Sequence, residues 1–234
     1  MFERPHHQRI ALVLQALRAD MLMERDCLFG GGTAIALRFG EYRESVDLDF
    51  MVSNLASYRE LRLQLTGPQE LRPLFSEAAA DVIDFHPVRA DQYGIRTWLG
   101  VGGGQIKFEI VLEGRIALQA PGPSDRICAV ATLTSLDMVT SKLLANADRW
   151  RDDGVFSRDI IDLAMMQPKR ALLMAGFSKA EVPYGKAVRE CFDKAIAQLK
   201  ERDGWLQRCM SAMQMELPRA VLCQHLRALE KAAR

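Results

Sequence analysis

The sequence predicts an α+β fold, with a sheet and flanking helices in residues 1–133 and a helical region in residues 134–234. Two observations predict this division. Apolar runs that alternate with polar residues, two of them joined by the turn Gly102-Gly103-Gly104, all fall before residue 133. After it come segments of helical length separated by turn residues, and Pro218 suits the start of the last one. We therefore expect two domains, an α+β core over residues 1–133 and a helical region over residues 134–234.

The N-terminal elements are expected to alternate between helix and strand. Ile10, Val13 and Leu17 are spaced as on one face of a helix, and Gly40 suits the end of a second helix. The expected helices span about residues 7–23, 33–39 and 55–65, and the expected strands about residues 27–29, 46–52, 82–85, 93–101, 105–112 and 127–133, the last closing the sheet. The C-terminal helices are expected over about residues 136–150, 157–166, 179–200, 205–216 and 219–233.

Size and composition are those of an ordinary globular protein. The chain has 234 residues, 49% hydrophobic and 26% charged, which is enough for one large domain or two small ones. Its formal net charge of +1 neither requires nor excludes a nucleic-acid partner, because local patches matter more than the sum. The N-terminus lacks the apolar stretch of a signal peptide, and no stretch approaches the ~18 consecutive apolar residues of a membrane span. We expect no membrane partner.

The cysteines point to a reducing compartment. They are five in number and scattered, with no Cys-x-x-Cys pair, which argues against both a zinc site and a disulfide framework. We therefore expect a cytoplasmic protein.

A glycine-rich run, Gly30-Gly31-Gly32 followed by Thr33, stands between an expected strand and an expected helix. Such glycines let a phosphate approach the backbone, and the helix behind them offers N–H groups and a favourable dipole. Thr33 suits either a helix cap or a hydroxyl donor to a phosphate oxygen. Taken alone, the run is more often an ordinary turn.

A second run places Asp47 and Asp49 two residues apart on an expected strand. Residues at that spacing point to the same face, and a shared divalent cation removes the repulsion between two adjacent carboxylates. Mg²⁺ is typically held by one or two carboxylates and substrate phosphates. An isolated Asp-x-Asp is more often a pair of solvated acids at a strand edge.

Together the two runs resemble the nucleotidyltransferase signature of the polymerase-β-like superfamily. More narrowly, they resemble the AbiEii/AbiGii toxin family, bacterial nucleotidyltransferases of toxin–antitoxin pairs. The matching residues are Gly31, Gly32, Thr33, Arg43, Ser45, Asp47, Asp49 and Phe50. The resemblance implies a polymerase-β-like mixed sheet, Mg²⁺ at the aspartates, and a nucleoside triphosphate (NTP) bound by Gly31, Gly32, Thr33, Arg43 and Ser45.

A third carboxylate is needed if two metal ions are to be bridged. In the run from Ile106 to Ile110 the apolar residues alternate with Lys107 and Glu109, which face the other side. The resemblance places its third acidic residue on such a strand, so Glu109 is the candidate, with Glu113 and Asp84 as alternatives. The competing interpretation is a solvent-facing Glu109 paired with a neighbouring lysine.

The resemblance continues to residue 166 through Lys142 and Arg149 and then Asp159 and Asp162. The first pair is seven positions apart on one helical face, and the second pair is three apart on the next helix. The resemblance implies that Lys142 contacts the triphosphate and that Asp159 lies near it as an orienting or proton-accepting group. An ion-pair network among these side chains is the alternative, and the two interpretations are compatible.

Two other groups of residues are set aside. His6 and His7 are interpreted as part of a flexible end. Several arginines either line a path for nucleic acid or belong to a solvated surface, which is the commoner case where no aromatic residues are interleaved. These arginines are Arg59, Arg62, Arg72, Arg89 and Arg96.

The resemblance implies Mg²⁺-dependent transfer of a nucleoside monophosphate from an NTP to an acceptor hydroxyl. It further suggests RNA, a tRNA 3′ end in particular, as the acceptor, and a cognate antitoxin as a partner. One alternative is a small-molecule nucleotidyltransferase of the antibiotic-modifying type, and another is a binding module of the same fold without activity. A basic groove leading to Asp47 favours RNA, whereas a closed acidic pocket favours an aminoglycoside.

Overall fold

The computed structural model describes residues 2–234, which divide into two compact units. The sheet unit comprises Met1–Arg38 and Ser45–Thr134, and the helical unit comprises Phe39–Glu44 and Ser135–Arg234. The short segment Phe39–Glu44 therefore groups with residues that lie almost a hundred positions further along the chain.

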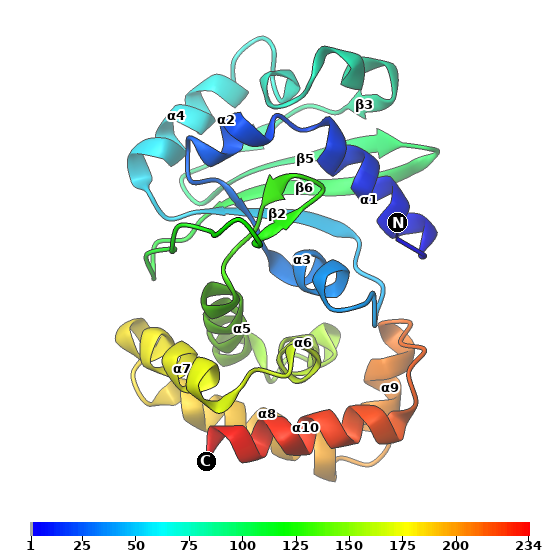
Figure 1. Ribbon diagram of the computed structural model, residues 1–234, viewed down its shortest axis with the longest axis vertical. Helices are drawn as coiled ribbons and strands as arrows, with labels where there is room; N and C mark the ends of the chain where they lie inside the picture. Colours follow the sequence, from blue (N-terminus) through cyan, green and yellow to red (C-terminus); the bar gives the residue numbers. More distant parts are fainter. Residues whose placement is uncertain (1) are drawn as a thin grey trace. The chain divides into compact units, whose positions relative to one another are not determined.

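The sheet unit is built on a mixed sheet with the strand order β1-β2-β6-β5-β3, and β4 pairs with β5 (Figure 1). Its strands are β1 (Leu28–Phe29), β2 (Asp47–Val52), β3 (Ile83–Phe85), β4 (Arg89–Ala90), β5 (Gly94–Val101) and β6 (Gly104–Leu112). β2 and β6 are parallel, whereas the other pairs are antiparallel. The expected glycine turn joins β5 to β6, with φ of +53° at Gly102 and +75° at Gly103, which suits a two-residue hairpin. The predicted α+β class is confirmed.

Alternation along the strands gives the sheet one apolar and one polar face. In β2, Leu48, Phe50 and Val52 are fully buried while Asp47 and Asp49 are only half-buried. The same pattern in β6 buries apolar side chains next to them, and the rings of Phe50 and Phe108 lie 5.2 Å apart. Burial of such a face is the main stabilising term for a sheet of this kind.

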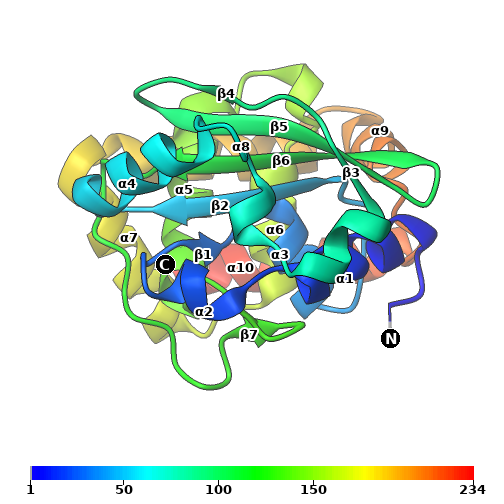
Figure 2. The same cartoon turned by 90° about the horizontal axis from the view of Figure 1, so that it is seen from above.

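Helices lie on both sides of this sheet. They are α1 (Pro5–Ala16), α2 (Ala19–Met23), α3 (Gly31–Arg38) and α4 (Leu55–Leu65), with the 3₁₀ turns η1 (Arg72–Leu74) and η2 (Glu77–Asp81). Figures 1 and 2 show α1 and α4 on one side and α3 on the other. Asn54 caps α4 by accepting hydrogen bonds from the N–H groups of Ala56 and Ser57, which fixes its start at the predicted position.

Two expected elements of the sheet unit are wrong. The single helix over residues 7–23 is two helices, because the Arg18 N–H donates to the Leu74 carbonyl at 2.8 Å instead of continuing the helix. The run over residues 127–133 is not one strand of the sheet: only Thr132 bridges to Phe29 of β1, and the Leu133 N–H donates to the Phe29 carbonyl. That segment holds a separate hairpin of β7 (Arg126–Ile127) and β8 (Val130–Ala131), turned by positive φ at Cys128 and Ala129.

The helical unit contains α5 (Ser135–Arg149), η3 (Asp153–Val155), α6 (Arg158–Met166), α7 (Arg170–Tyr184), α8 (Ala187–Glu201), α9 (Trp205–Ala212) and α10 (Arg219–Ala233). α5 packs against α6, α7 and α8, and α10 packs against α6 (Figure 1). The helix expected over residues 179–200 is wrong: the chain breaks at Gly185, whose φ is +61°, so that α7 ends and α8 begins there. Within residues 2–234 we find no helix with the length and apolarity needed to cross a bilayer.

Candidate active site

The parallel pairing of β2 with β6 brings the predicted acidic residues together. Asp49 is in register with Glu109, and Asp47 is in register with Lys107. Side chains in register on neighbouring strands point to the same face, so the three carboxylates share the polar face of the sheet. The alternative candidates lie elsewhere: Glu113 is buried and paired with Arg115, and Asp84 is on β3.

Glu109 already has two cationic partners. Arg96 Nε lies 2.5 Å from its Oε1, Lys107 Nζ lies 2.7 Å from its Oε2, and 13% of the side chain is exposed. The hydrogen bond to Glu109 raises the pKa of Lys107; burial opposes that rise, and the nearby charges of Glu109, Asp47 and Asp49 add to it. The pairing with a neighbouring lysine that competed with a metal-binding role is therefore present.

The glycine turn packs directly against Asp49. Gly31 has φ of +67°, and a β-carbon added to it would overlap the Asp49 carboxylate and lie 2.8 Å from the Asp49 Cβ. The preceding Gly30 N–H donates to the Asp49 carbonyl at 2.8 Å. Only glycine suits both this backbone conformation and this close approach. The turn at the start of α3 is thus packed against and hydrogen-bonded to Asp49 of β2, so the position of each depends on the other.

Thr33 and Ser45 are linked to each other and to His7. The Thr33 hydroxyl, on a residue that is only 1% exposed, donates to Ser45 Oγ at 2.8 Å, and the Ser45 N–H donates to His7 Nε2 at 3.1 Å. These bonds fix the chain that leads into β2. The Thr33 hydroxyl proton is thereby engaged by Ser45, whereas the backbone N–H groups at the start of α3 are the donors typical of a helix N-terminus.

The interpretation of His7 as part of a flexible end is wrong. Its side chain is fully buried, and Nε2 accepts a hydrogen bond, so the neutral ring carries its proton on Nδ1. A sequence signal for this existed: His7 stands three residues before Ile10 and seven before Leu14, on the buried face of α1.

In the helical unit an ion-pair network surrounds Asp162, which is fully buried. Arg43 binds it through Nε at 2.7 Å and Nη2 at 3.0 Å, and the Tyr42 hydroxyl donates to it at 2.5 Å. Lys142 Nζ lies 2.6 Å from Asp162 Oδ2 and 2.9 Å from Asp159 Oδ1. Arg149 completes the network by binding both oxygens of Asp159.

Burial and charge act in opposite directions on these two aspartates. Burial raises the pKa of Asp162, but the attraction of Arg43 and Lys142 is stronger and holds that pKa well below its usual range. Burial likewise raises the pKa of Asp159, and Lys142 and Arg149 bring it below the usual value. Both are therefore ionised. Arg43 and Lys142 are 4% and 5% exposed, which favours the ion-pair interpretation of this part of the motif over direct contact with a nucleotide.

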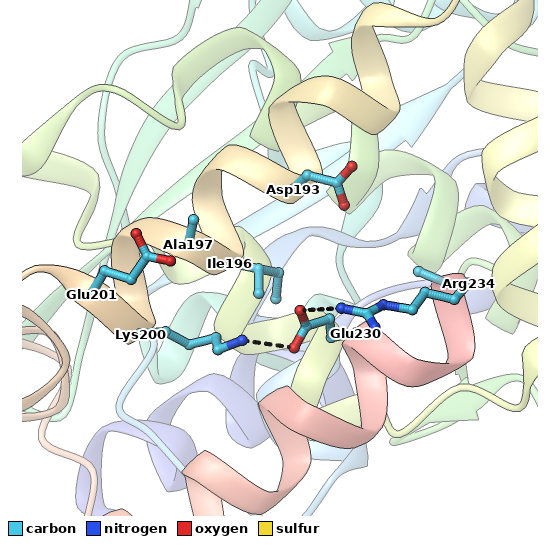
Figure 3. A pocket seen from close by; sticks show the side chains of 8 residues that line it. Asp193, Ile196, Ala197, Lys200, Glu201, Glu230 and Arg234 are labelled. Atoms are coloured by element: carbon cyan, nitrogen blue, oxygen red, sulfur yellow. Dashed lines mark hydrogen bonds and ion pairs between the residues drawn. The ribbon is translucent and has the colours of Figure 1, made fainter.

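A hollow of about 350 Å³ in the helical unit, between α8 and α10, is shown in Figure 3. Lys200 and Arg234 each lie 3.0 Å from a different oxygen of Glu230, and the Lys200 pair joins the two helices. The hydrogen bond from Lys200 lowers the pKa of Glu230. None of the motif residues lines this hollow, and we assign it no chemical role.

The donor set on β2 suits a divalent cation of the magnesium type. Asp47 and Asp49 are adjacent, half-buried and next to a turn of backbone N–H groups, and such a pair with substrate phosphates is a usual environment for Mg²⁺. Within residues 2–234, no cluster of three or more His, Cys, Asp or Glu side chains is arranged as a metal site. Each oxygen of Glu109 accepts one hydrogen bond, from Arg96 or Lys107, and has a further lone pair with which it could bind a cation.

Comparison with known families decides the identity of the fold. Residues 13–225 match the family described as nucleotidyl transferase AbiEii toxin, type IV toxin–antitoxin system. The chain belongs to this family. It is therefore a nucleotidyltransferase, as the resemblance implied, and the matched region spans both units.

Solved structures give weaker similarities. MenT4, a nucleotidyltransferase toxin from Mycobacterium tuberculosis, is 17% identical with a TM-score of 0.48, over 97% of this chain and 95% of that one. JHP933 from Helicobacter pylori is 16% identical with a TM-score of 0.46, over 99% of this chain and 96% of that one. No curated protein matches the chain. We take no residue role from these proteins.

Proposed function

We propose that this AbiEii-family enzyme transfers a nucleoside monophosphate from an NTP to the terminal hydroxyl of an RNA, in a reaction that needs Mg²⁺. The observation that carries the proposal is the close packing of Gly31 against Asp49. It supports the proposal because a glycine turn suited to phosphate lies next to a carboxylate suited to Mg²⁺, as a reaction at a triphosphate requires.

The triphosphate is held at the start of α3. The N–H groups of the first turn point towards a bound anion, and the helix dipole favours its negative charge. Asp47 and Asp49 hold Mg²⁺, which supplies charge neutralisation for the attacking and leaving oxygens of the phosphoryl group. Gly31 keeps the turn close enough to Asp49 for phosphate and carboxylate to meet.

Glu109 serves the acceptor. In the reaction the acceptor oxygen forms a bond to the α-phosphorus, the bond from that phosphorus to the bridging oxygen of the β-phosphate breaks, and pyrophosphate leaves. The acceptor proton needs a base, and Glu109 is the carboxylate in register with Asp49. Arg96 and Lys107 hold its oxygens in place through hydrogen bonds.

Two roles are open to Lys142 and Asp159: direct action at the triphosphate, or positioning of other residues through the ion-pair network. Contact of Lys142 with the triphosphate requires its ammonium to leave Asp159 and Asp162, and its burial argues against this. We therefore propose that the two residues act as positioning residues within the network, with Arg43 as a further member. A positioning role predicts that Lys142→Arg lowers kcat while leaving the KM for NTP nearly unchanged.

The family match supports a cognate antitoxin as partner, and the resemblance to toxin nucleotidyltransferases suggests RNA as acceptor. A toxin that modifies a tRNA 3′ end would block aminoacylation and arrest growth, and a type IV system supplies an antitoxin that counters the toxin. We propose both for this chain. A small-molecule acceptor of the antibiotic type is the alternative, and the surface near Glu109 described below disfavours it.

The test is label transfer from each α-³²P-NTP to total bacterial RNA with Mg²⁺. We expect one RNA size class to be labelled by the wild type, and no label with Asp47→Asn or Asp49→Asn. Asp20→Asn, at an exposed acid of α2, is the matched control and should retain activity. Periodate oxidation of the RNA 3′ ends should abolish the label. Label that survives oxidation, or that appears with both aspartate variants, contradicts the proposal.

A further inference from the structure

A groove of about 970 Å³ in the sheet unit lies where α4, the start of β5 and the end of β6 meet. It extends along β6 to Glu109, the residue assigned above to the acceptor. Its lining is Leu55, Tyr58, Arg59, Arg62, Gln92, Tyr93, Arg96, Glu109, Val111, Leu112, Glu113, Gly114 and Arg115. The groove thus leads to the polar face of the sheet.

Its charge is positive. Four arginines and two glutamates line it, and two of the arginines are neutralised locally: Arg96 by Glu109 and Arg115 by Glu113. Arg59 and Arg62 remain, both exposed on α4. Within residues 2–234 no acidic side chain pairs with either of them, and Arg62 makes a single long hydrogen bond, 3.4 Å, to the Asp91 carbonyl. Two guanidinium groups are therefore available to an anionic ligand.

The groove also offers a flat surface for a base. Tyr93 is 65% exposed, and Leu55, which also lines the groove, is 48% exposed. A positively charged groove with an exposed aromatic ring is the usual environment for a single-stranded nucleic acid, whose phosphates contact the cations and whose bases stack on the ring. A cationic antibiotic would be repelled by the same arginines.

We infer that this groove binds the single-stranded 3′ segment of the RNA acceptor. Phosphates contact Arg59 and Arg62, a base stacks on Tyr93, and the strand leads its terminal hydroxyl to Glu109. The inference rests on the proposed function, because it takes Glu109 as the group that serves the acceptor. Of the five arginines considered from the sequence, Arg59, Arg62 and Arg96 line the groove, whereas Arg72 stacks on Phe85 and Arg89 lies on β4.

The experiment measures binding of the intact protein to an unstructured 12-nucleotide RNA labelled at its 5′ end, by fluorescence anisotropy without NTP. Arg59→Glu is expected to raise Kd about tenfold and to lower the slope of log K against log salt by about 0.7 or more, as for one lost phosphate contact. Tyr93→Ala is expected to raise Kd about fivefold or more without changing that slope. Arg126→Glu, at an exposed arginine of β7 that does not line the groove, is the matched control and should bind as the wild type.

A parallel experiment measures nucleotide transfer by the wild type and by Asp47→Asn. Failure of the proposed function can then be told apart from failure of the groove assignment. RNA binding that depends on Arg59 and Tyr93 supports the groove even if no NTP is consumed, in which case the proposed function fails alone. If Arg59→Glu and Arg126→Glu weaken binding equally, or if the wild type transfers nucleotide but does not bind the RNA, the groove assignment is wrong while the enzyme assignment stands. Circular dichroism melting curves confirm that each variant is folded.

Discussion

Gly31 and Gly40 have the same kind of backbone but different surroundings. Their φ values are +67° and +84°, yet an added β-carbon meets Asp49 at Gly31 and no atom within 4 Å at Gly40. Alanine at Gly40 is therefore expected to cost only the conformational strain, about 1 kcal/mol. Alanine at Gly31 adds displacement of the Asp49 carboxylate.

We predict that Gly31→Ala lowers kcat about 100-fold or more, because displacement of a reacting group by about 1 Å has that effect. Gly40→Ala should retain kcat within about twofold, since the comparable strain there leaves the carboxylates in place. Steady-state transfer assays and urea unfolding of both variants test this. Equal activity of the two variants would show that the turn does not position Asp49.

The contribution of Asp162 to the free energy of unfolding is predicted to depend on pH. Asp162→Asn leaves Arg43 and Lys142 buried without their full partner, and removal of one partner of a buried pair costs about 3–5 kcal/mol of unfolding free energy at pH 7. The pKa of Asp162 is held below its usual value, so its contribution is present above about pH 4 and is lost as the pH falls through the folded-state pKa.

The difference in stability between the wild type and Asp162→Asn should therefore shrink below about pH 4. Urea unfolding at several pH values between 7 and 3 measures it. Asp153→Asn, which removes an exposed pair with Arg202, is the control and should have a much smaller effect at every pH. A difference that stays constant with pH would mean that the charge on Asp162 does not stabilise the fold.

At the scale of single elements, the sequence predicts those whose boundaries depend on local chemistry. The β5–β6 hairpin follows from its glycines, and α4 follows from its cap at Asn54 and the break at Gly67. Elements that depend on a distant partner, or on backbone conformations unusual for their residue types, were missed. The break before Arg18 needs the Leu74 carbonyl, and the hairpin of β7 and β8 needs positive φ at two residues that are not glycine.

The candidate site likewise has features that the local sequence predicts and features that it does not. Strand alternation alone could place Asp47 and Asp49 on one face of β2, and Glu109 on the polar side of β6, since both strands bury every second residue. The register that puts Asp49 beside Glu109 could not be predicted from alternation. The partners of Arg43 could not be predicted, because its contact with Asp162 spans 119 positions of sequence. Likewise, the burial of Lys142 depends on the packing of α5 against α6, which no local pattern encodes.

Helix packing in the helical unit gives a further prediction at this scale. Gly176 of α7 lies against α5, and a β-carbon there would be 2.5 Å from Val139 Cγ1. Gly176→Ala should therefore destabilise the unit by about 1–3 kcal/mol through overpacking, even though alanine favours the helix by about 1 kcal/mol. Val139→Ala in the same chain should restore much of the loss, which urea unfolding of the single and double variants measures. Additive effects would show that the two residues do not meet.

At the scale of the whole molecule, the net charge does not reveal how the charged side chains are distributed over the surface. A formal net charge of +1 predicts no partner, yet Arg59 and Arg62 are concentrated in one groove while acidic residues gather on β2 and β6. Likewise, no single cut of the chain separates the two units, because the helical unit includes both Phe39–Glu44 and Ser135–Arg234. Phe39–Glu44 groups with the helical unit because Tyr42 and Arg43 bind Asp162.

This grouping predicts how the helical unit behaves when it is isolated. A fragment of residues 135–234 lacks Tyr42 and Arg43, so Asp162 keeps its charge but loses the two hydrogen bonds from the guanidinium and the one from the hydroxyl. A buried carboxylate whose charge is balanced by Lys142 alone is less stabilising than one that also binds Arg43 and Tyr42. Asp162→Asn should therefore lower the free energy of unfolding less in the fragment than in the full chain, with a coupling energy of about 0.5–3 kcal/mol between residue 162 and the segment 39–44.

Fluorescence of Trp150 and Trp205, in a Trp98→Phe background for the full chain, reports the unfolding of this unit in urea. Fusion of residues 39–44 to the fragment through a Gly/Ser linker should restore the larger cost. If the substitution costs the same with and without residues 39–44, Arg43 and Tyr42 are not what stabilises the charge on Asp162, and the segment joins the helical unit for another reason.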